Sequence, residues 1–167
     1  MALYEVIYGQ IGCGKSSYAL SIINPSESFK FGNNHHLKEW LLLEFGSIKR
    51  HEDENRKHGL AFKRTTLSSI VEDIESVSKP TLVIDEWTTF STYSLLWPQE
   101  KIKDKINDIF GSIDGNKNLE RAVFISSDYM PFMPFKLYKK RALWNKELFR
   151  KADSITKIEY GIPIKIK

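Results

Sequence analysis

Apolar residues fall into short continuous runs that alternate along the chain with segments of helical spacing. Each run contains β-branched or aromatic residues and ends at a glycine or a polar residue, which is typical of buried strands. The runs that predict strands are residues 3–8, 81–85 and 122–126. Residues 155–166 predict two further short strands hinged at Gly161 and Pro163, and residues 26–32 predict a weak strand or a loop.

The segments between these runs predict helices, because their apolar positions recur every three to four residues. The predicted helices are residues 16–23, 36–45, 65–77, 102–113 and 138–151. Residues 47–64 are rich in His, Arg, Lys and Glu and predict a surface loop or a short exposed helix. Since strands alternate with helices, the pattern predicts an α/β fold with a mainly parallel sheet.

The length and composition favour one ordinary globular domain. The chain has 167 residues, and we expect residues 1–167 to form a single unit. Its 41% hydrophobic and 28% charged residues argue against a disordered or collagen-like chain. No run reaches the roughly 18 apolar residues of a membrane span, so no membrane association is expected. A single cysteine excludes an internal disulfide and favours a cytoplasmic location.

The charge balance is mildly basic and points weakly to an anionic partner. There are 25 Lys and Arg against 21 Asp and Glu, a net charge of +4. A small anionic ligand or a nucleic acid would suit this charge, and so would a solvated surface with a slight excess of lysine. Because the lysines are spread along most of the chain, we rank a nucleic acid below a small anion.

The sequence GQIGCGKS at residues 9–16 matches the phosphate-binding loop pattern GxxxxGK[ST] at every fixed position. Its glycines let backbone N–H groups turn around phosphate oxygens, and the helix that follows would point its N-terminus at the anion. Lys15 would reach the β- and γ-phosphates, and the Ser16 hydroxyl would bind Mg²⁺. The residues expected to contact nucleotide are Gly9, Gln10, Ile11, Gly12, Cys13, Gly14, Lys15, Ser16 and Ser17.

This loop follows a predicted strand and precedes a predicted helix, so it sharpens the expected fold. We expect a P-loop NTPase-like, three-layer α/β/α domain with a mainly parallel central sheet. The alternative is a plain glycine turn with an exposed lysine.

Asp85 and Glu86 are the acidic residues that fit such a site. Asp85 closes the run 81–85, where a carboxylate can hold Mg²⁺ opposite the phosphate loop, although it could instead cap a strand. The predicted metal ligands are therefore Ser16 and Asp85. Glu86 would be a catalytic base that activates water, as in motor-like ATPases, or an ordinary loop residue. In the same interpretation Ser126 or Ser127 would sense the γ-phosphate.

Several segments together resemble the bifunctional adenosylcobalamin biosynthesis proteins, a family of adenosylcobinamide kinases and adenosylcobinamide-phosphate guanylyltransferases. Besides the phosphate loop, these are His51 with Arg56 five residues later, the sequence Asp85-Glu86-Trp87-Thr88, and the closing residues Asn145, Asp153 and 161–167 (GIPIKIK). The chain differs from that family at Lys57, where the family has proline, and at Tyr93, where it has asparagine.

The resemblance implies a nucleotide-dependent kinase and guanylyltransferase that acts on adenosylcobinamide, with ATP or GTP and Mg²⁺ as cofactors. It implies a guanylyl-histidine at His51, a phosphate contact at Arg56, and a homo-oligomer, expected as a trimer. A neutral imidazole is a competent nucleophile, whereas a lone histidine in a charged loop is more often simply solvated. The catalytic candidates are His51, Lys15 and Glu86.

Two further hypotheses remain open at this point. The first is a P-loop ATPase that uses Asp85 and Glu86 in a nucleic-acid or assembly motor and has no corrinoid role. The second is a degenerate module that retains nucleotide but has lost catalysis. Among the tryptophans, Trp87 is the candidate to stack on a base or a corrinoid, and the others are expected in the core.

Overall fold

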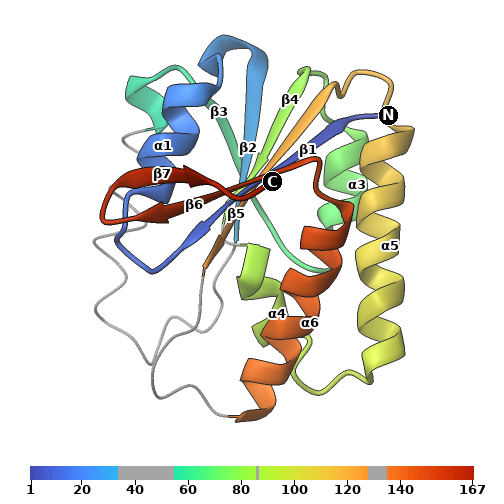
Figure 1. Cartoon of the computed structure of the whole chain (residues 1–167). Coiled ribbons are helices and arrows are strands. Elements are labelled where there is room, and N and C mark those ends of the chain that lie inside the picture. The colour runs from blue at the N-terminus through green and yellow to red at the C-terminus, as the bar shows by residue number, and fades with distance from the viewer. Residues whose placement is uncertain (34–54, 86, 128–134) are drawn as a thin grey trace.

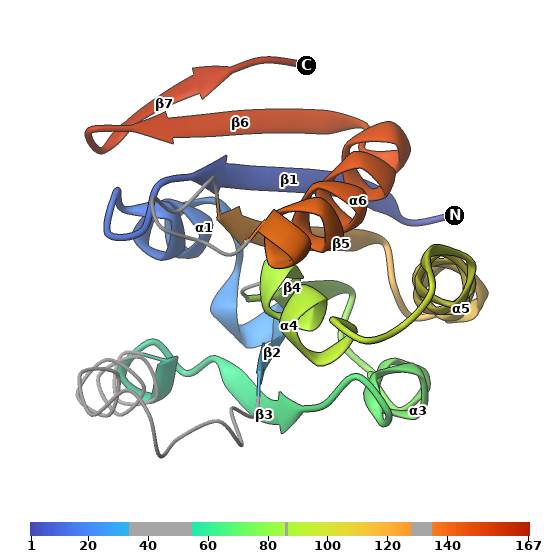
Figure 2. The same ribbon diagram turned by 90° about the horizontal axis from the view of Figure 1, so that it is seen from below.

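The computed structural model describes residues 1–33, 55–85, 87–127 and 135–167, which form three layers (Figures 1 and 2). The described part contains a seven-stranded sheet with the order β3-β2-β4-β5-β1-β6-β7. The strands are β1 (Leu3–Gly9), β2 (Ser28–Asn33), β3 (Ala61–Thr65), β4 (Thr81–Ile84), β5 (Arg121–Ser127), β6 (Ser154–Glu159) and β7 (Ile162–Lys165). Neighbouring strands pair in parallel except β6 and β7, which are antiparallel.

The helices cover the two faces of the sheet unequally. On one face lies α1, and the other face carries α3, α4, α5 and α6 (Figure 2). Their bounds are α1 (Lys15–Ile22), α3 (Ile70–Glu75), α4 (Phe90–Tyr93), α5 (Gln99–Gly115) and α6 (Phe135–Lys151), with short 3-10 helices at Pro25–Glu27 and Trp87–Thr89. The expected three-layer α/β/α arrangement with a mainly parallel sheet is confirmed. Within the described ranges, none of the helices is both long and apolar enough to span a bilayer.

The apolar core divides between these two faces because successive strand residues point to opposite sides. The larger cluster lies under α3 to α6 and the smaller one lies under α1. Strand β5 is the most completely buried, with six of its seven residues inaccessible, as a central parallel strand requires.

Trp87 lies at the centre of the larger cluster and not in a ligand-facing position. Its side chain is fully buried, and its ring lies 5.9 Å from that of Phe110 and 4.9 Å from that of Trp144. The indole N–H donates to the Trp144 carbonyl at 3.1 Å. The prediction that Trp87 stacks on a base or a corrinoid is therefore wrong, because the polar tip of the ring is satisfied inside the core.

The expected loop or helix at residues 47–64 is wrong for its last part, where the chain forms strand β3. Among the described strands, it lies at the edge of the sheet and pairs with β2 alone, with Phe29 opposite Ala61. It is mostly half-exposed or exposed, so its sequence AFKRT carries Lys63 and Arg64 and lacks the apolar run of a central strand. Residues 55–57, just before it, are helical.

The predicted helix 65–77 begins later than expected, at Ile70. Thr65 belongs to β3, and the hydroxyl of Thr66 and the backbone N–H of Ser69 are hydrogen-bonded to each other in a turn at 3.2 Å. Short hydroxyl side chains compete in this way with the helical hydrogen bonds. The predicted hinge at Pro163 is also displaced: the turn is at Tyr160 and Gly161, and Pro163 lies inside β7. The predicted helix 36–45 lies outside the described residues.

Candidate functional site

The phosphate loop connects the end of β1 to the start of α1 at the carboxyl-terminal edge of the sheet. Gly9, the last residue of β1, lies opposite Ser127 of β5 and Ile158 of β6, so the loop is flanked on both sides. Gly14 immediately precedes α1 in a left-handed conformation with φ of 96°. In the part of the chain that the structure describes, no side chain caps the first turn of α1, so its amide groups are those that an anion at the N-terminus would meet.

Lys15 lies folded into this loop. Its side chain is buried, and its ammonium donates to the carbonyl of Gly9 at 3.1 Å and to that of Gln10 at 2.7 Å. The alternative of an exposed lysine on a plain glycine turn does not describe this geometry. The residues between Gly9 and Lys15 differ in exposure: Gln10, Ile11 and Gly12 are exposed, whereas Cys13 is half-buried. Ser16 is half-buried and Ser17 is exposed.

Gly9 is the residue whose lack of a side chain the loop requires. Its φ is 152°, which side chains rarely adopt, and a Cβ built there would lie 2.4 Å from the carbonyl oxygen of Ile158. The same Cβ would lie 2.9 Å from the Cys13 sulfur. The first glycine of the motif is therefore fixed by a close approach to β6 as well as by its backbone conformation.

Asp85 follows β4 directly, on the α1 side of the sheet. Its backbone N–H donates to the Phe31 carbonyl at 2.9 Å, which extends the pairing of β4 with β2. Asp85 follows β4 and the phosphate loop follows β1. Strand β5 lies between these two strands, so β4 and β1 are separated by two strand spacings of about 4.8 Å each. The two predicted metal ligands, Ser16 and Asp85, thus lie at the same edge of the sheet and on the same face.

Lys30 is a residue of this site that the sequence interpretation missed. It lies on β2, opposite Val83 of β4, and its ammonium is 2.7 Å from Oδ2 of Asp85. The Lys30 side chain is 3% exposed and that of Asp85 is 13% exposed, so the pair is largely removed from water. The available signal was a lysine between two phenylalanines in the weak strand SFKFGN.

The end of β5 carries the two serines that were considered as phosphate sensors. Ser126 is fully buried, and its hydroxyl donates to the side-chain oxygen of Asn145 on α6 at 2.6 Å. The Asn145 amide in turn reaches the Ser127 carbonyl at 3.5 Å. Ser127 is also buried, one residue further along the strand and on the opposite face. Asn145 therefore ties α6 to the strand beside the phosphate loop.

The other predicted site residues are not brought to the loop in the described part of the chain. His51 and Glu86 lie outside the described residues. Arg56 is exposed in the segment 55–60, which precedes β3 and so lies toward the amino-terminal edge of the sheet (Figure 1). The phosphate loop lies at the carboxyl-terminal edge, and the role of Arg56 stays a prediction.

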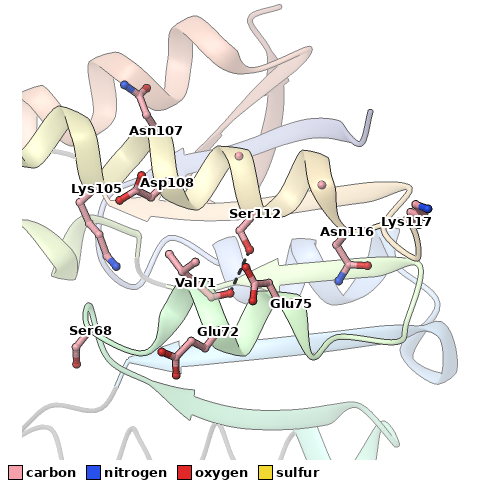
Figure 3. Close-up of a pocket in the computed structure, with 12 residues that line it drawn as sticks. Ser68, Val71, Glu72, Glu75, Lys105, Asn107, Asp108, Ser112, Asn116 and Lys117 are labelled. Carbon is pink, nitrogen blue, oxygen red and sulfur yellow. Dashed lines mark hydrogen bonds between the residues drawn. The ribbon is translucent and has the colours of Figure 1, made fainter.

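A separate hollow lies between α3 and α5 (Figure 3), on the face of the sheet opposite α1 (Figure 2). Its wall carries charges of both signs, from Glu72, Glu75, Asp108 and Lys105. The Ser112 hydroxyl donates to the Val71 carbonyl at 3.1 Å and joins the two helices across it. This hydrogen bond makes the hollow a helix–helix junction rather than part of the nucleotide site.

Comparison with known proteins gives matches in structure only. No family model matches the chain, and no curated protein sequence matches it. A KaiC-like protein from the archaeon Pyrococcus horikoshii superposes with a TM-score of 0.53 at 12% identity, over 93% of this chain and 70% of that protein. A second P. horikoshii protein superposes with a TM-score of 0.57 at 10% identity, over 99% of this chain and 87% of that one.

The fold and the loop together define the class of protein. A mostly parallel sheet, with a phosphate-binding loop between its first strand and first helix, is the architecture of nucleotide-binding α/β proteins. This chain has a P-loop NTPase-like fold, and its similarity to the KaiC-like protein agrees with that assignment.

Proposed function

We propose that this protein binds a nucleoside triphosphate with Mg²⁺ on the loop 9–17 and hydrolyses the bond to the terminal phosphate. The observation that carries the proposal is the fold of the loop around Lys15, whose buried ammonium is held by two carbonyls of the same loop. Bonds from an ammonium to phosphate oxygens are charge-assisted and stronger than bonds to neutral carbonyls. An incoming triphosphate would therefore take the ammonium over from Gly9 and Gln10.

The residues at the carboxyl-terminal edge fit Mg²⁺ as well. Ser16 and Asp85 offer oxygen ligands, which this ion prefers, and Asp85 already balances a cation, the Lys30 ammonium. Bound between them and the phosphates, Mg²⁺ would neutralise charge on the phosphate oxygens. Glu86 is the sequence-based candidate for the residue that orients and deprotonates the attacking water. ATP and GTP carry the same triphosphate, so both are candidate substrates.

Phosphate release from ATP and from GTP, measured with Mg²⁺, tests this proposal. Lys15→Ala and Asp85→Asn should each lower kcat/KM by about a hundredfold or more, because each removes a charge that acts on the phosphates or their cation. Lys103→Ala, on the exposed face of α5, is the matched control and should change nothing. Equal release by wild type and Lys15→Ala would contradict the proposal.

Kinase and guanylyltransferase activity on adenosylcobinamide is the second candidate. It is supported by the resemblance and by one contact, in which Asn145 of the closing segment binds the end of β5 beside the loop. GTP labelled at the α-phosphate distinguishes the two candidates. Acid-labile label on the wild-type chain that is lost in His51→Ala would favour the transferase. Absence of label together with release of γ-phosphate would favour hydrolysis.

A further inference from the structure

The Lys30–Asp85 ion pair places a fixed positive charge on the carboxylate that is the metal-ligand candidate. Lysine is rarely buried, and a buried charge is tolerated only when a partner compensates for its lost hydration. Here the compensation comes from the Asp85 carboxylate at 2.7 Å. Because Lys30 is opposite Val83, a member of the cluster under α1, its side chain lies on the face of the sheet that carries the phosphate loop.

Asn55 holds the ammonium from a second direction. Its side chain is 1% exposed, and its Oδ1 accepts from Lys30 at 3.4 Å. The Nδ2 group of Asn55 is buried without a hydrogen-bond partner among the described residues. Among the described residues, the site therefore contains a buried cation, a buried amide donor and one carboxylate. Such an arrangement has more donors than acceptors and is suited to a further anionic oxygen.

We propose that Lys30 is a positioning residue that forms an ion pair with Asp85 when neither nucleotide nor metal is bound. Through this pair it determines how strongly nucleotide binding depends on Mg²⁺. This inference rests on the proposed nucleotide-binding function. The Lys30 ammonium and Mg²⁺ are both cations that would bind the Asp85 carboxylate, so each would weaken the attraction of the other to it. When no metal is present, Lys30 cancels the negative charge of Asp85, and the phosphates of the nucleotide meet a neutral pair.

Removal of the ammonium should therefore move two affinities in opposite directions. In Lys30→Met, Asp85 would lose the Lys30 ammonium and would repel a metal-free triphosphate more strongly, so the affinity for that triphosphate should fall by about tenfold. Mg²⁺ would no longer compete with the ammonium for this carboxylate, so affinity measured with Mg²⁺ should stay constant or rise. The ratio of the dissociation constant in EDTA to that in Mg²⁺ should thus increase by about tenfold or more.

The experiment measures binding of a fluorescent N-methylanthraniloyl-ATP to the full chain, in EDTA and in Mg²⁺. Lys63→Met is the matched control, because Lys63 is also an ion-paired lysine on an adjacent strand but pairs with Asp73. Its EDTA-to-Mg²⁺ ratio should equal that of wild type. Lys30→Arg, which retains the charge, should restore a near wild-type ratio. A ratio in Lys30→Met equal to that of wild type would overturn the proposal and leave Lys30 with a structural role.

A second pair of variants covers the case in which Lys30→Met does not fold, since it removes the ammonium from a largely buried carboxylate. Asp85→Asn retains the ammonium, and the double variant Lys30→Met/Asp85→Asn has neither charge. In EDTA, Asp85→Asn should bind the probe about tenfold more tightly than the double variant. Equal affinities would overturn the proposal.

Failure of the proposed function gives a different result. In that case wild type does not bind the probe more tightly than Lys15→Ala in either buffer. If wild type binds and Lys15→Ala does not, nucleotide binding stands and the Lys30 variants alone decide the inference.

Discussion

At the scale of single residues, the phosphate loop is shaped by one glycine and one lysine. Gly9 allows β1 to end within contact distance of the Ile158 carbonyl, and Lys15 folds back on the carbonyls of Gly9 and Gln10. The carboxyl-terminal edge of the sheet thus carries two buried lysines, Lys15 and Lys30, whose ammonium groups are held by oxygen acceptors within the protein. The site is arranged to hold positive charge in place before an anion arrives.

Gly9→Ala should impair the protein even though it adds one methyl group. The new Cβ would lie 2.4 Å from backbone and the φ of 152° is unsuitable for alanine, so we expect a loss of roughly 1–3 kcal/mol in the free energy of unfolding. Urea titration measures this change. Gly111→Ala on α5 is the control, because its Cβ meets nothing within 4 Å and alanine favours a helix. If Gly9→Ala were as stable as Gly111→Ala, the close approach to β6 would be refuted.

Asp73 should make the free energy of unfolding decrease at acidic pH. Burial by itself would raise the pKa of Asp73, but hydrogen bonds from Lys63, Thr65 and Ser69 outweigh it and hold the pKa below its usual value near 3.8. A lowered folded-state pKa gives stability that is present above the unfolded pKa and is lost as pH falls through the folded one. The free energy of unfolding of wild type should therefore drop more steeply below about pH 4 than that of Asp73→Asn. If the free energy of unfolding fell equally with pH in the two proteins, Asp73 would not be the cause of the acid sensitivity.

At the scale of elements, the turn between β6 and β7 shows a local misfit. Glu159 and Ile162 are paired, and the two residues between them have positive φ, 51° at Tyr160 and 81° at Gly161. Two-residue hairpins of this kind favour Asn-Gly. Tyr160 is 95% exposed, so its ring contributes little packing.

Tyr160→Asn should therefore stabilise the protein, by roughly 0.5–1 kcal/mol, because asparagine tolerates the left-handed conformation. Tyr160→Val should act in the opposite direction, since a β-branched residue suits that conformation poorly. Thermal melts of the two variants measure the difference. A melting temperature of Tyr160→Asn below that of Tyr160→Val would contradict this description of the turn.

The elements also separate what the sequence could predict from what it could not. Strands β1, β4 and β5 lie in the sheet interior and each contains a run of mostly apolar residues, which predicted them within one or two residues. Strand β3 lies at an edge of the sheet, where charged side chains can stay in water. It therefore contains Lys63 and Arg64 and lacks the apolar run from which a strand is predicted. The phosphate loop was readable because its motif is local. Lys30 was not, because its partner Asp85 is 55 positions away in the sequence and on another strand.

At the scale of the whole molecule, the strand order determines what meets at the carboxyl-terminal edge. Parallel strands β1, β4 and β5 all end there, which brings together the loop, Asp85 and the serines of β5. Ligands of open α/β sheets bind at this edge as a rule. The predicted trimer and the predicted corrinoid substrate depend on the resemblance and stay predictions. Light scattering of the purified chain would measure the assembly.

Calorimetric titration of wild type and of Lys15→Ala with ATP and with GTP, in Mg²⁺, determines whether the loop 9–17 binds nucleotide. We expect binding to wild type with one site per chain and a loss of affinity of tenfold or more in Lys15→Ala, about 1.4 kcal/mol or more. Circular dichroism should show that the variant is folded. Nucleotide affinity that is the same in both proteins, or absent from wild type, would contradict the claim that the loop 9–17 is a nucleotide site.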